Sequence, residues 1–150
     1  MWGFLAELLL GDGTLRPELR ALLEEEGLVL IEEGLPGSVR YRRFRAPGRY
    51  HHGKLTPERI AIGVSEDRLV VYCRSGRVNL IDTPFSSPRI AILDVSLRGE
   101  GKLAFRIDYD RGGVPKVSGE VTIVARTSRA AEVVEQVSAR LRHVAPTDAA

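Results

Sequence analysis

The chain has 150 residues, of which 43% are apolar and 28% charged, with a formal net charge of +2; this composition is ordinary for a single globular domain. No apolar run approaches the roughly 20 residues of a membrane-spanning helix. The single cysteine, Cys73, excludes an internal disulfide and a cysteine metal cluster. Residues 1–10 lack the basic start and cleavage site of a secretory signal, so a reduced, cytoplasmic setting is expected.

Charge is distributed unevenly along the chain. Residues 1–33 hold eight acidic and two basic side chains, a net −6, whereas residues 34–59 hold seven basic and one acidic, a net +6. The remainder is about neutral. A basic segment that directly follows an acidic one is therefore the main electrostatic feature of the sequence.

Two short helices are predicted ahead of the strands. Residues 1–10 are apolar on one helical face, which includes Trp2, and Pro17 to Glu26 carries an apolar stripe that ends at Gly27. We expect both helices to pack on the body of the domain. Insertion of the first helix at a membrane surface is the alternative, but its polar face offers Glu7 and no base.

The next thirty or so residues are predicted to hold two short strands and a long loop. Leu28 to Ile31 is an apolar run, and Gly34 to Gly37 is predicted as a turn. Val39 to Ala46 is rich in β-branched and aromatic residues but alternates poorly, so we expect an edge strand or a bulge. Ala46 to Pro57 contains several glycine and proline residues and is predicted as a loop.

From residue 59 onward the pattern becomes regular. Alternation of apolar and polar residues predicts strands at 59–64, 69–73, 78–82, 89–97, 103–109 and 120–125. The apolar phase slips where Ile92 is followed by Leu93, which predicts a bulge or bend there. No helix separates consecutive strands, so we expect an antiparallel sandwich or barrel rather than a parallel sheet.

The last strand leads directly into an amphipathic helix. Apolar residues recur at spacings of three and four over about four turns, namely at Ala130, Val133, Val134, Val137 and Leu141. Thr127 or Ser128 can cap its first amides, and Pro146 ends it. A single helix after a run of strands is expected to cover the open side of a sheet or barrel.

The order of these elements carries a resemblance. Ile62 to Tyr72 combines a hydrophobic strand, a Ser-acidic turn and an Arg-Leu pair that opens the next strand, and Val121 to Leu141 joins a closing strand to a helix. Over about residues 38–143 this order resembles a pleckstrin-homology-like (PH-like) domain of the bacterial PH or GRAM type. The resemblance implies a seven-stranded antiparallel bent barrel of two near-orthogonal sheets, closed at one end by the C-terminal helix.

The resemblance also suggests a domain division and a general role. Residues 1–27 would form a helical N-terminal extension, residues 28–145 the PH-like domain and residues 146–150 a tail. Members of this family are mostly binding modules for phospholipid head groups, peptides or other proteins, and bacterial members often oligomerise. We therefore expect a non-catalytic binding or scaffold module that forms a homo-oligomer.

The candidate contact surface is the basic segment of the chain. It consists of Arg40, Arg42, Arg43, Arg45, Arg49, His51, His52 and Lys54. Guanidinium groups bind phosphate in bidentate fashion, so an anionic lipid surface or a protein partner is expected; the balanced net charge disfavours nucleic acid. The alternative is a solvated strand neutralised by the acidic residues Glu24, Glu25, Glu26, Glu32 and Glu33.

Motifs for catalysis and for cofactor binding are not recognisable. The sequence has no Gly-x-Ser-x-Gly elbow, His-Glu-x-x-His pair or phosphate-binding glycine loop, so we predict neither enzymatic activity nor a cofactor. His51 and His52 are adjacent on a predicted strand or loop and do not suggest a metal site, and Cys73 is expected to be a buried thiol. A small-molecule-binding barrel with catalytic side chains that meet only in space is the alternative.

Overall fold

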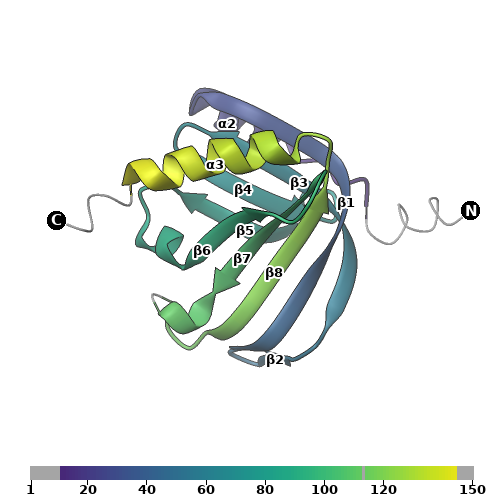
Figure 1. Ribbon diagram of the computed structural model, residues 1–150, viewed down its shortest axis with the longest axis vertical. Helices are drawn as coiled ribbons and strands as arrows, with labels where there is room; N and C mark the ends of the chain where they lie inside the picture. Colours follow the sequence, from purple (N-terminus) through teal and green to yellow (C-terminus); the bar gives the residue numbers. More distant parts are fainter. Residues whose placement is uncertain (1–10, 113, 145–150) are drawn as a thin grey trace, which may run out of the picture.

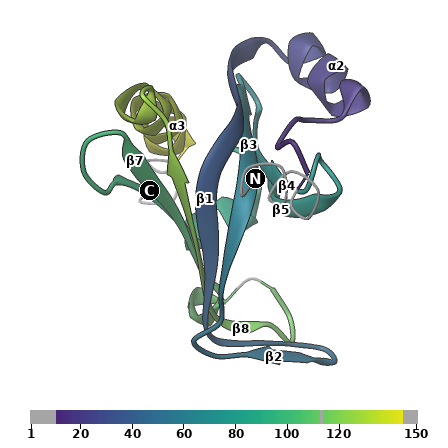
Figure 2. The same cartoon turned by 90° about the vertical axis from the view of Figure 1, so that its right-hand side faces the viewer.

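The computed structural model describes residues 11–112 and 114–144, which form a curled sheet with helices on both of its sides (Figures 1 and 2). The helix predicted at 1–10 and the tail from 146 onward lie outside these residues. In the described part, no helix is both long enough and apolar enough to cross a membrane.

The fold is mainly β, as predicted. The elements in chain order are α2 (Pro17–Glu25), β1 (Leu28–Ala46), β2 (Arg49–His51), β3 (Leu55–Ser65), β4 (Arg68–Cys73), β5 (Val78–Pro84), the 3₁₀-helix η1 (Pro88–Ile92), β6 (Leu93–Leu97), β7 (Lys102–Asp108), the 3₁₀-helix η2 (Tyr109–Arg111), β8 (Ser118–Arg126) and α3 (Ala130–Val144). The seven predicted strands correspond to β1 and β3 to β8, and β2 is an additional short strand.

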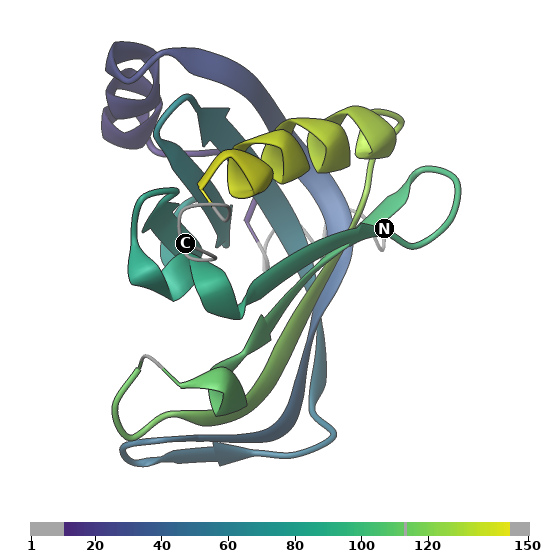
Figure 3. The ribbon, with the colours of Figure 1, turned by 60° about the vertical axis from the view of Figure 1, so that its left-hand side comes forward.

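All strand pairs are antiparallel, in the order β5-β4-β3-β1-β8-β7-β6, with β2 paired to the end of β1. The sheet curls into a half-barrel whose two edge strands are β5 and β6 (Figure 3). The first and last strands, β1 and β8, lie side by side at its centre, so a pairing between distant parts of the chain holds the two halves together.

The concave side of the sheet holds the main core. Alternate residues of each strand point inward, as Ile60, Ile62 and Val64 do from β3, and all three are fully buried. The helix α3 lies across this concave side (Figure 1) and buries its predicted stripe there, including Val133 and Val137. The predicted role of the C-terminal helix as a cover for the sheet is thus confirmed.

The helix α2 packs on the opposite, outer side of the sheet (Figure 2). Leu15 and Leu23 form a second small core with Ala61 of β3 and Val70 of β4. Gly63 makes this possible, because a Cβ atom there would collide with the side chains of Leu23 and Val70. Outward-facing apolar residues on β3 and β4 therefore determine where α2 docks.

The predicted turn at 34–37 is wrong. Here β1 continues through it as one strand of 19 residues, and the irregularity is a shift in its pairing with β3 between Glu32 and Leu35. Gly34 has a φ of 68°, which suits a bulge rather than a reversal of the chain. Gly37 serves a different purpose, because a Cβ atom there would meet the backbone oxygen of Val124 on β8.

The expectation for Val39 to Ala46 was partly right. The segment is not an edge strand, because β1 pairs with β3 on one side and β8 on the other. A bulge does occur: the register with β8 shifts between Arg42 and Arg45, and Arg43 has a φ of 50°. The poor alternation came from this bulge. The predicted loop 46–57 is mostly a hairpin that contains β2 and the start of β3.

The strand predicted at 89–97 is two elements. The 3₁₀-helix η1 occupies its first part and β6 begins at Leu93, so the slip in apolar phase marks a junction between helix and strand. The hydroxyl of Ser87 accepts a hydrogen bond from the Arg89 amide, and Pro88 occupies the first helical turn. These two features favour the start of a helix, and they outweigh the strand preference of the apolar residues that follow.

The close approach of β1 to β8 yields a stability prediction. Gly37→Ala should lower the free energy of unfolding by about 3 kcal/mol, because the new methyl group must displace backbone. Gly63→Ala is the matched comparison; there the methyl group collides with the side chains of Leu23 and Val70 and not with backbone, so we expect a smaller cost of about 1–2 kcal/mol, felt in the docking of α2. Urea denaturation of both variants measures the difference, and equal costs would contradict the proposed role of Gly37.

Candidate functional site

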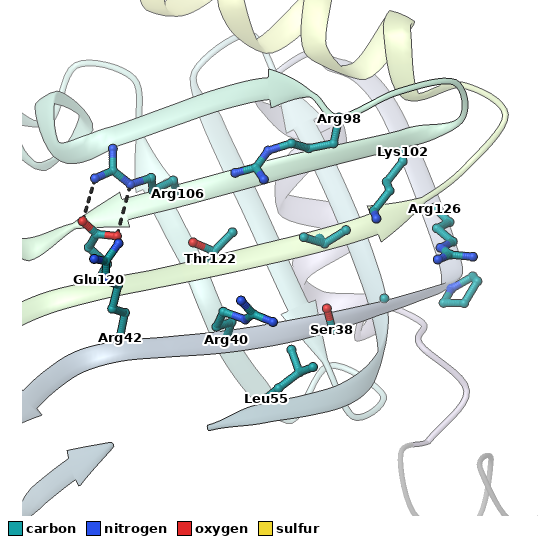
Figure 4. Close-up of a pocket in the computed structure, with 13 residues that line it drawn as sticks. Ser38, Arg40, Arg42, Leu55, Arg98, Lys102, Arg106, Glu120, Thr122 and Arg126 are labelled. Carbon is teal, nitrogen blue, oxygen red and sulfur yellow. Dashed lines mark hydrogen bonds and ion pairs between the residues drawn. The ribbon is translucent and has the colours of Figure 1, made fainter. Parts of the chain in front are cut away.

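The outer face of β1, β8 and β7 carries basic side chains (Figure 4). The docking of α2 on β3 and β4 and of α3 on the concave side leaves this face to solvent. Strand register sets its layout: Arg40 of β1 pairs with Thr122 of β8, which pairs with Arg106 of β7. Their neighbours Val39 and Ile123 point into the core.

These side chains surround an open groove with a volume of about 830 Å³, which we call the basic groove. Its lining comprises Pro36, Gly37, Ser38, Arg40, Arg42, Leu55, Arg98, Lys102, Arg106, Glu120, Thr122, Val124 and Arg126. Six of these residues are basic and one is acidic. The floor is made of small or polar side chains, so the charged groups stand around a shallow depression (Figure 4).

One end of the basic groove is electrostatically balanced. Arg106 binds Glu120 with an Nη2–Oε1 distance of 2.6 Å and lies 3.5–3.6 Å from Asp94 and Asp108. Arg111 binds the same Asp94 at 2.6 Å. The hydrogen bond from Arg106 holds the pKa of the Glu120 carboxyl below its usual range. Arg106 is thus already engaged by carboxylates of its own chain.

The centre and the other end of the basic groove are not balanced. Among the residues that the structure describes, Arg40, Arg98, Lys102 and Arg126 take part in none of the ion pairs. Figure 4 shows Lys102 and Arg126 at the end opposite Arg106, with the head groups of Arg40 and Arg98 between. An anion would therefore be drawn to the centre and to the Lys102 end.

A second basic surface lies on the hairpin of β1 and β2, at the end of the molecule away from both helices (Figures 1 and 2). We call it the basic hairpin; it comprises Arg43, Arg45, Arg49, His51, His52 and Lys54. All except the half-buried His51 are exposed. The Arg45 guanidinium lies 5.1 Å from the centre of the Tyr50 ring, which is 56% exposed. The four Arg and Lys side chains make no ion pair within the described part of the chain.

The eight predicted site residues therefore lie on two surfaces. Arg40 and Arg42 point into the basic groove, and the other six form the basic hairpin. Sequence reasoning missed Arg98, Lys102 and Arg126, which are more than 40 residues away along the chain. The alternation of β7 and β8 places their polar residues outward, but only the pairing of β8 with β1 brings them beside Arg40.

The two histidines have separate surroundings. The His51 ring lies 5.1 Å from the Tyr41 ring and stacks on Phe44 at 6.3 Å. Burial, followed by the charges of Lys54 and Arg49, lowers the pKa of His51 below 6.5. His52 accepts a hydrogen bond at Nδ1 from the Arg43 amide, 3.1 Å away. In residues 11–112 and 114–144, no group of three His, Cys, Asp or Glu side chains is arranged to hold a metal ion.

The acidic segment does not neutralise the basic surfaces as the alternative supposed. Glu26 binds Arg68, Glu32 binds Arg129, and Glu33 binds Arg20. These pairs tie α2 and the start of α3 to strands of the sheet. Glu24 and Glu25 are exposed on α2, which lies at the opposite end of the molecule from the basic hairpin (Figure 2). The acidic residues that form ion pairs thus stabilise the fold elsewhere.

Cys73 is buried, as predicted. Its side chain points into the sheet interior beside the carboxylate of Glu58, and burial raises the pKa of the thiol to about 12. The thiolate is the reactive form, so this cysteine is suited to packing rather than to nucleophilic chemistry. Glu58 is itself buried and binds Arg74 at 3.1 Å.

Comparison with known proteins leaves the family open: no family model matches the chain, and no curated protein matches it.

The surroundings of His51 yield a pH prediction. Because its pKa is lower in the folded chain than the 6.5 of a free imidazole, folding should be most stable above pH 6.5 and weaken as the pH falls towards the folded pKa. Lys54→Ala removes one repelling charge and should raise the pKa of His51. NMR titration of the imidazole protons measures this shift. Arg16→Gln, far from the basic hairpin, is the control, and an equal shift there would contradict the assignment.

Proposed function

We propose that this chain is a non-catalytic binding module of PH-like type that engages an anionic partner through the basic hairpin and the basic groove. The observation that carries the proposal is the set of Arg and Lys side chains without an ion-pair partner on one continuous stretch of β1 and its neighbours. Elsewhere in the described residues, most buried or half-buried arginines are paired, as Arg68 and Arg129 are. Unpaired cations in one region provide long-range attraction for an anion.

The PH-like assignment is supported by the arrangement of the strands. The resemblance implies a bent antiparallel barrel closed at one end by a helix that follows the last strand. Here β1 pairs with β8, and α3 begins four residues after β8 ends. The strand order is therefore compatible with the resemblance noted in the sequence, and the family itself remains part of the proposal.

An anionic membrane surface is the favoured partner. The basic hairpin projects from one end of the molecule and combines cations with the exposed rings and chains of Tyr50 and Leu55, which are 56% and 52% exposed. Tyrosine and leucine insert at the boundary between head groups and acyl chains, while each Arg or Lys near the surface contributes about 1 kcal/mol of attraction to anionic lipid. The net charge of +2 lacks the basic excess of typical nucleic-acid binders.

The enzymatic alternative receives no specific support from the described cavities. The cavity at Asp82 and the one at Glu58 hold a single carboxylate each, and both carboxylates are bound by arginines. A pair of carboxylates or histidines with displaced pKa values would be the expected sign of acid–base chemistry. The absence of catalytic activity stays a prediction.

Vesicle co-sedimentation tests the proposal. Arg43→Gln plus Arg49→Gln, which removes two charges from the basic hairpin, should weaken binding to phosphatidylserine-containing vesicles by about 30-fold, given about 1 kcal/mol per cation. Arg98→Gln plus Arg126→Gln removes the same charge from the basic groove and tells which surface contributes more. Binding by the unaltered chain should weaken as salt rises from 0.05 to about 0.5 M.

A matched control separates the effect of the basic surfaces on vesicle binding from the effect of the net charge. Ala21→Glu plus Ala139→Glu changes the net charge equally, at exposed positions of α2 and α3. It should affect vesicle binding less than either arginine pair. Equal losses in all three variants, or no binding to anionic vesicles at low salt, would refute the proposal for lipid. Binding to single-stranded DNA instead would reassign the partner to nucleic acid, and binding to neither would leave an acidic protein surface.

Self-association is also expected, because β5 and β6 leave the half-barrel with two unpaired edges. Light scattering at micromolar concentrations should give a mass above the 16.5 kDa of one chain. A mass that stays at the monomer value across this range would contradict the expectation.

A further inference from the structure

A second cavity lies inside the half-barrel and has a volume of about 290 Å³; it shares Phe44 with the basic hairpin, because that ring also stacks on His51. It is lined by residues of β1, β5, η1, β6, β7 and η2 and of the loop before β8, and the two 3₁₀-helices lie on the same side of the molecule (Figure 3). Its apolar lining includes Phe44, Ile81, Ile92, Leu93 and Ile107. This volume is near the lower limit of the roughly 300–1,000 Å³ of small-molecule sites.

The cavity exists because the sheet does not close. No backbone ladder joins β5 to β6, so the core between these two strands ends at an opening instead of at a neighbouring strand. These five apolar side chains keep 6–8% exposure, and others in the lining such as Leu80 and Ile90 are more exposed, whereas deeper core residues such as Phe105 and Ile123 have none. The cavity is therefore an extension of the hydrophobic core that solvent can reach.

The polar groups at this opening favour a negative charge. Arg89 of η1 lines the cavity, is exposed, and takes part in no ion pair within the described residues. The half-buried Tyr109 also lines it; burial raises the pKa of this phenol, and the charge of Arg89 acts in the opposite direction, so the hydroxyl stays protonated. Among the described residues, neither the Arg89 guanidinium nor the Tyr109 hydroxyl donates a hydrogen bond to an acceptor.

The only carboxylate in the lining is already engaged. Asp82 binds Arg68 at 2.6 Å through one oxygen and accepts a hydrogen bond from the Tyr72 hydroxyl at 2.9 Å through the other. The hydrogen bond and the burial of Tyr72 raise the pKa of that phenol to about 12, which keeps it a donor. Asp82 therefore leaves the positive charge of Arg89 uncompensated.

We propose that this cavity binds a single-chain anionic amphiphile, of which a medium-chain carboxylate is the simplest form. The acyl chain would lie among the apolar side chains, and the carboxylate would accept hydrogen bonds from Arg89 and Tyr109. The cavity volume of about 290 Å³ is roughly ten times the ~30 Å³ that one water molecule occupies. With each carbon of the ligand taking a volume of about that size, a chain of about eight to ten carbons fits. The cavity borders the basic hairpin at Phe44, whose ring lies 5.6 Å from the Arg49 guanidinium, but binding of an amphiphile there does not depend on the role proposed for the basic hairpin and the basic groove.

Decanoate is the probe for this site. Titrated into the full chain below the concentration at which it forms micelles, it should shift the methyl resonances of Ile81, Ile92, Leu93 and Ile107 and bind with saturation. Decanol, which has the same chain but no charge, should bind at least tenfold more weakly, because charge-assisted hydrogen bonds exceed neutral ones. Shifts spread over the surface, or equal affinities of the two probes, would overturn the proposal.

Substitution of the anion-binding side chain gives an independent check. Arg89→Gln should weaken decanoate binding about tenfold and leave decanol binding nearly unchanged. Arg16→Gln removes the same charge at an exposed position before α2 and should leave the affinity for both probes unaltered. If decanoate bound these two variants with equal affinity, the proposed role of Arg89 in binding the carboxylate would be overturned, even if the cavity binds an apolar chain.

Discussion

The structure depends on one strand, β1, whose backbone pairs with β3 along one side and with β8 along the other. Gly37 of β1 and Gly119 of β8 permit the close approach of the two backbones. Each half of the sheet consists of local hairpins, in which short turns bring neighbouring strands together. The two halves become one molecule only when β1 meets β8, about 80 residues later in the chain, so this non-local pairing determines both the curl of the sheet and the surfaces on its two sides.

The outer face of the sheet shows how the same strand geometry serves two purposes. On β3 and β4 the outward positions are small or apolar, and α2 covers them. On β1, β8 and β7 many outward positions are charged, with small or polar residues such as Ser38 and Thr122 between them, and the basic groove stays open. Ion pairs such as Glu26–Arg68 and Glu33–Arg20 hold α2 and the chain beside it on its half of the face. Single residues at alternate positions of the strands thus determine whether a part of the outer face is covered by a helix or exposed to solvent.

Local patterns in the sequence predicted most elements, and the failures have physical causes. The closing helix and the strands from 59 onward follow regular periods, and the structure confirms them. The turn expected at 34–37 was wrong. A glycine can form a bulge as readily as a reversal of the chain direction, and only the strand that pairs with this segment determines which of the two forms. The start of 89–97 formed a 3₁₀-helix because Ser87 and Pro88 favour a helical first turn.

The candidate site could be predicted only in part. The basic hairpin is contiguous in sequence, so its charges were visible from composition, and the structure places them together. The basic groove draws Arg98, Lys102 and Arg126 from a different part of the chain. Finding them required the register of β8 on β1, which alternation within a single strand does not determine.

The open edge of the half-barrel has a mechanical consequence. Since no hydrogen-bond ladder spans the space between β5 and β6, the distance between these strands depends on side-chain contacts and on the segment 85–92 that connects them. The sheet can therefore change its curvature by small adjustments of strand twist, spread over the seven strands of its main path, without breaking a backbone hydrogen bond. Such a change in curvature would let the interior accommodate bound molecules of different size while the backbone hydrogen bonds of the sheet stay intact.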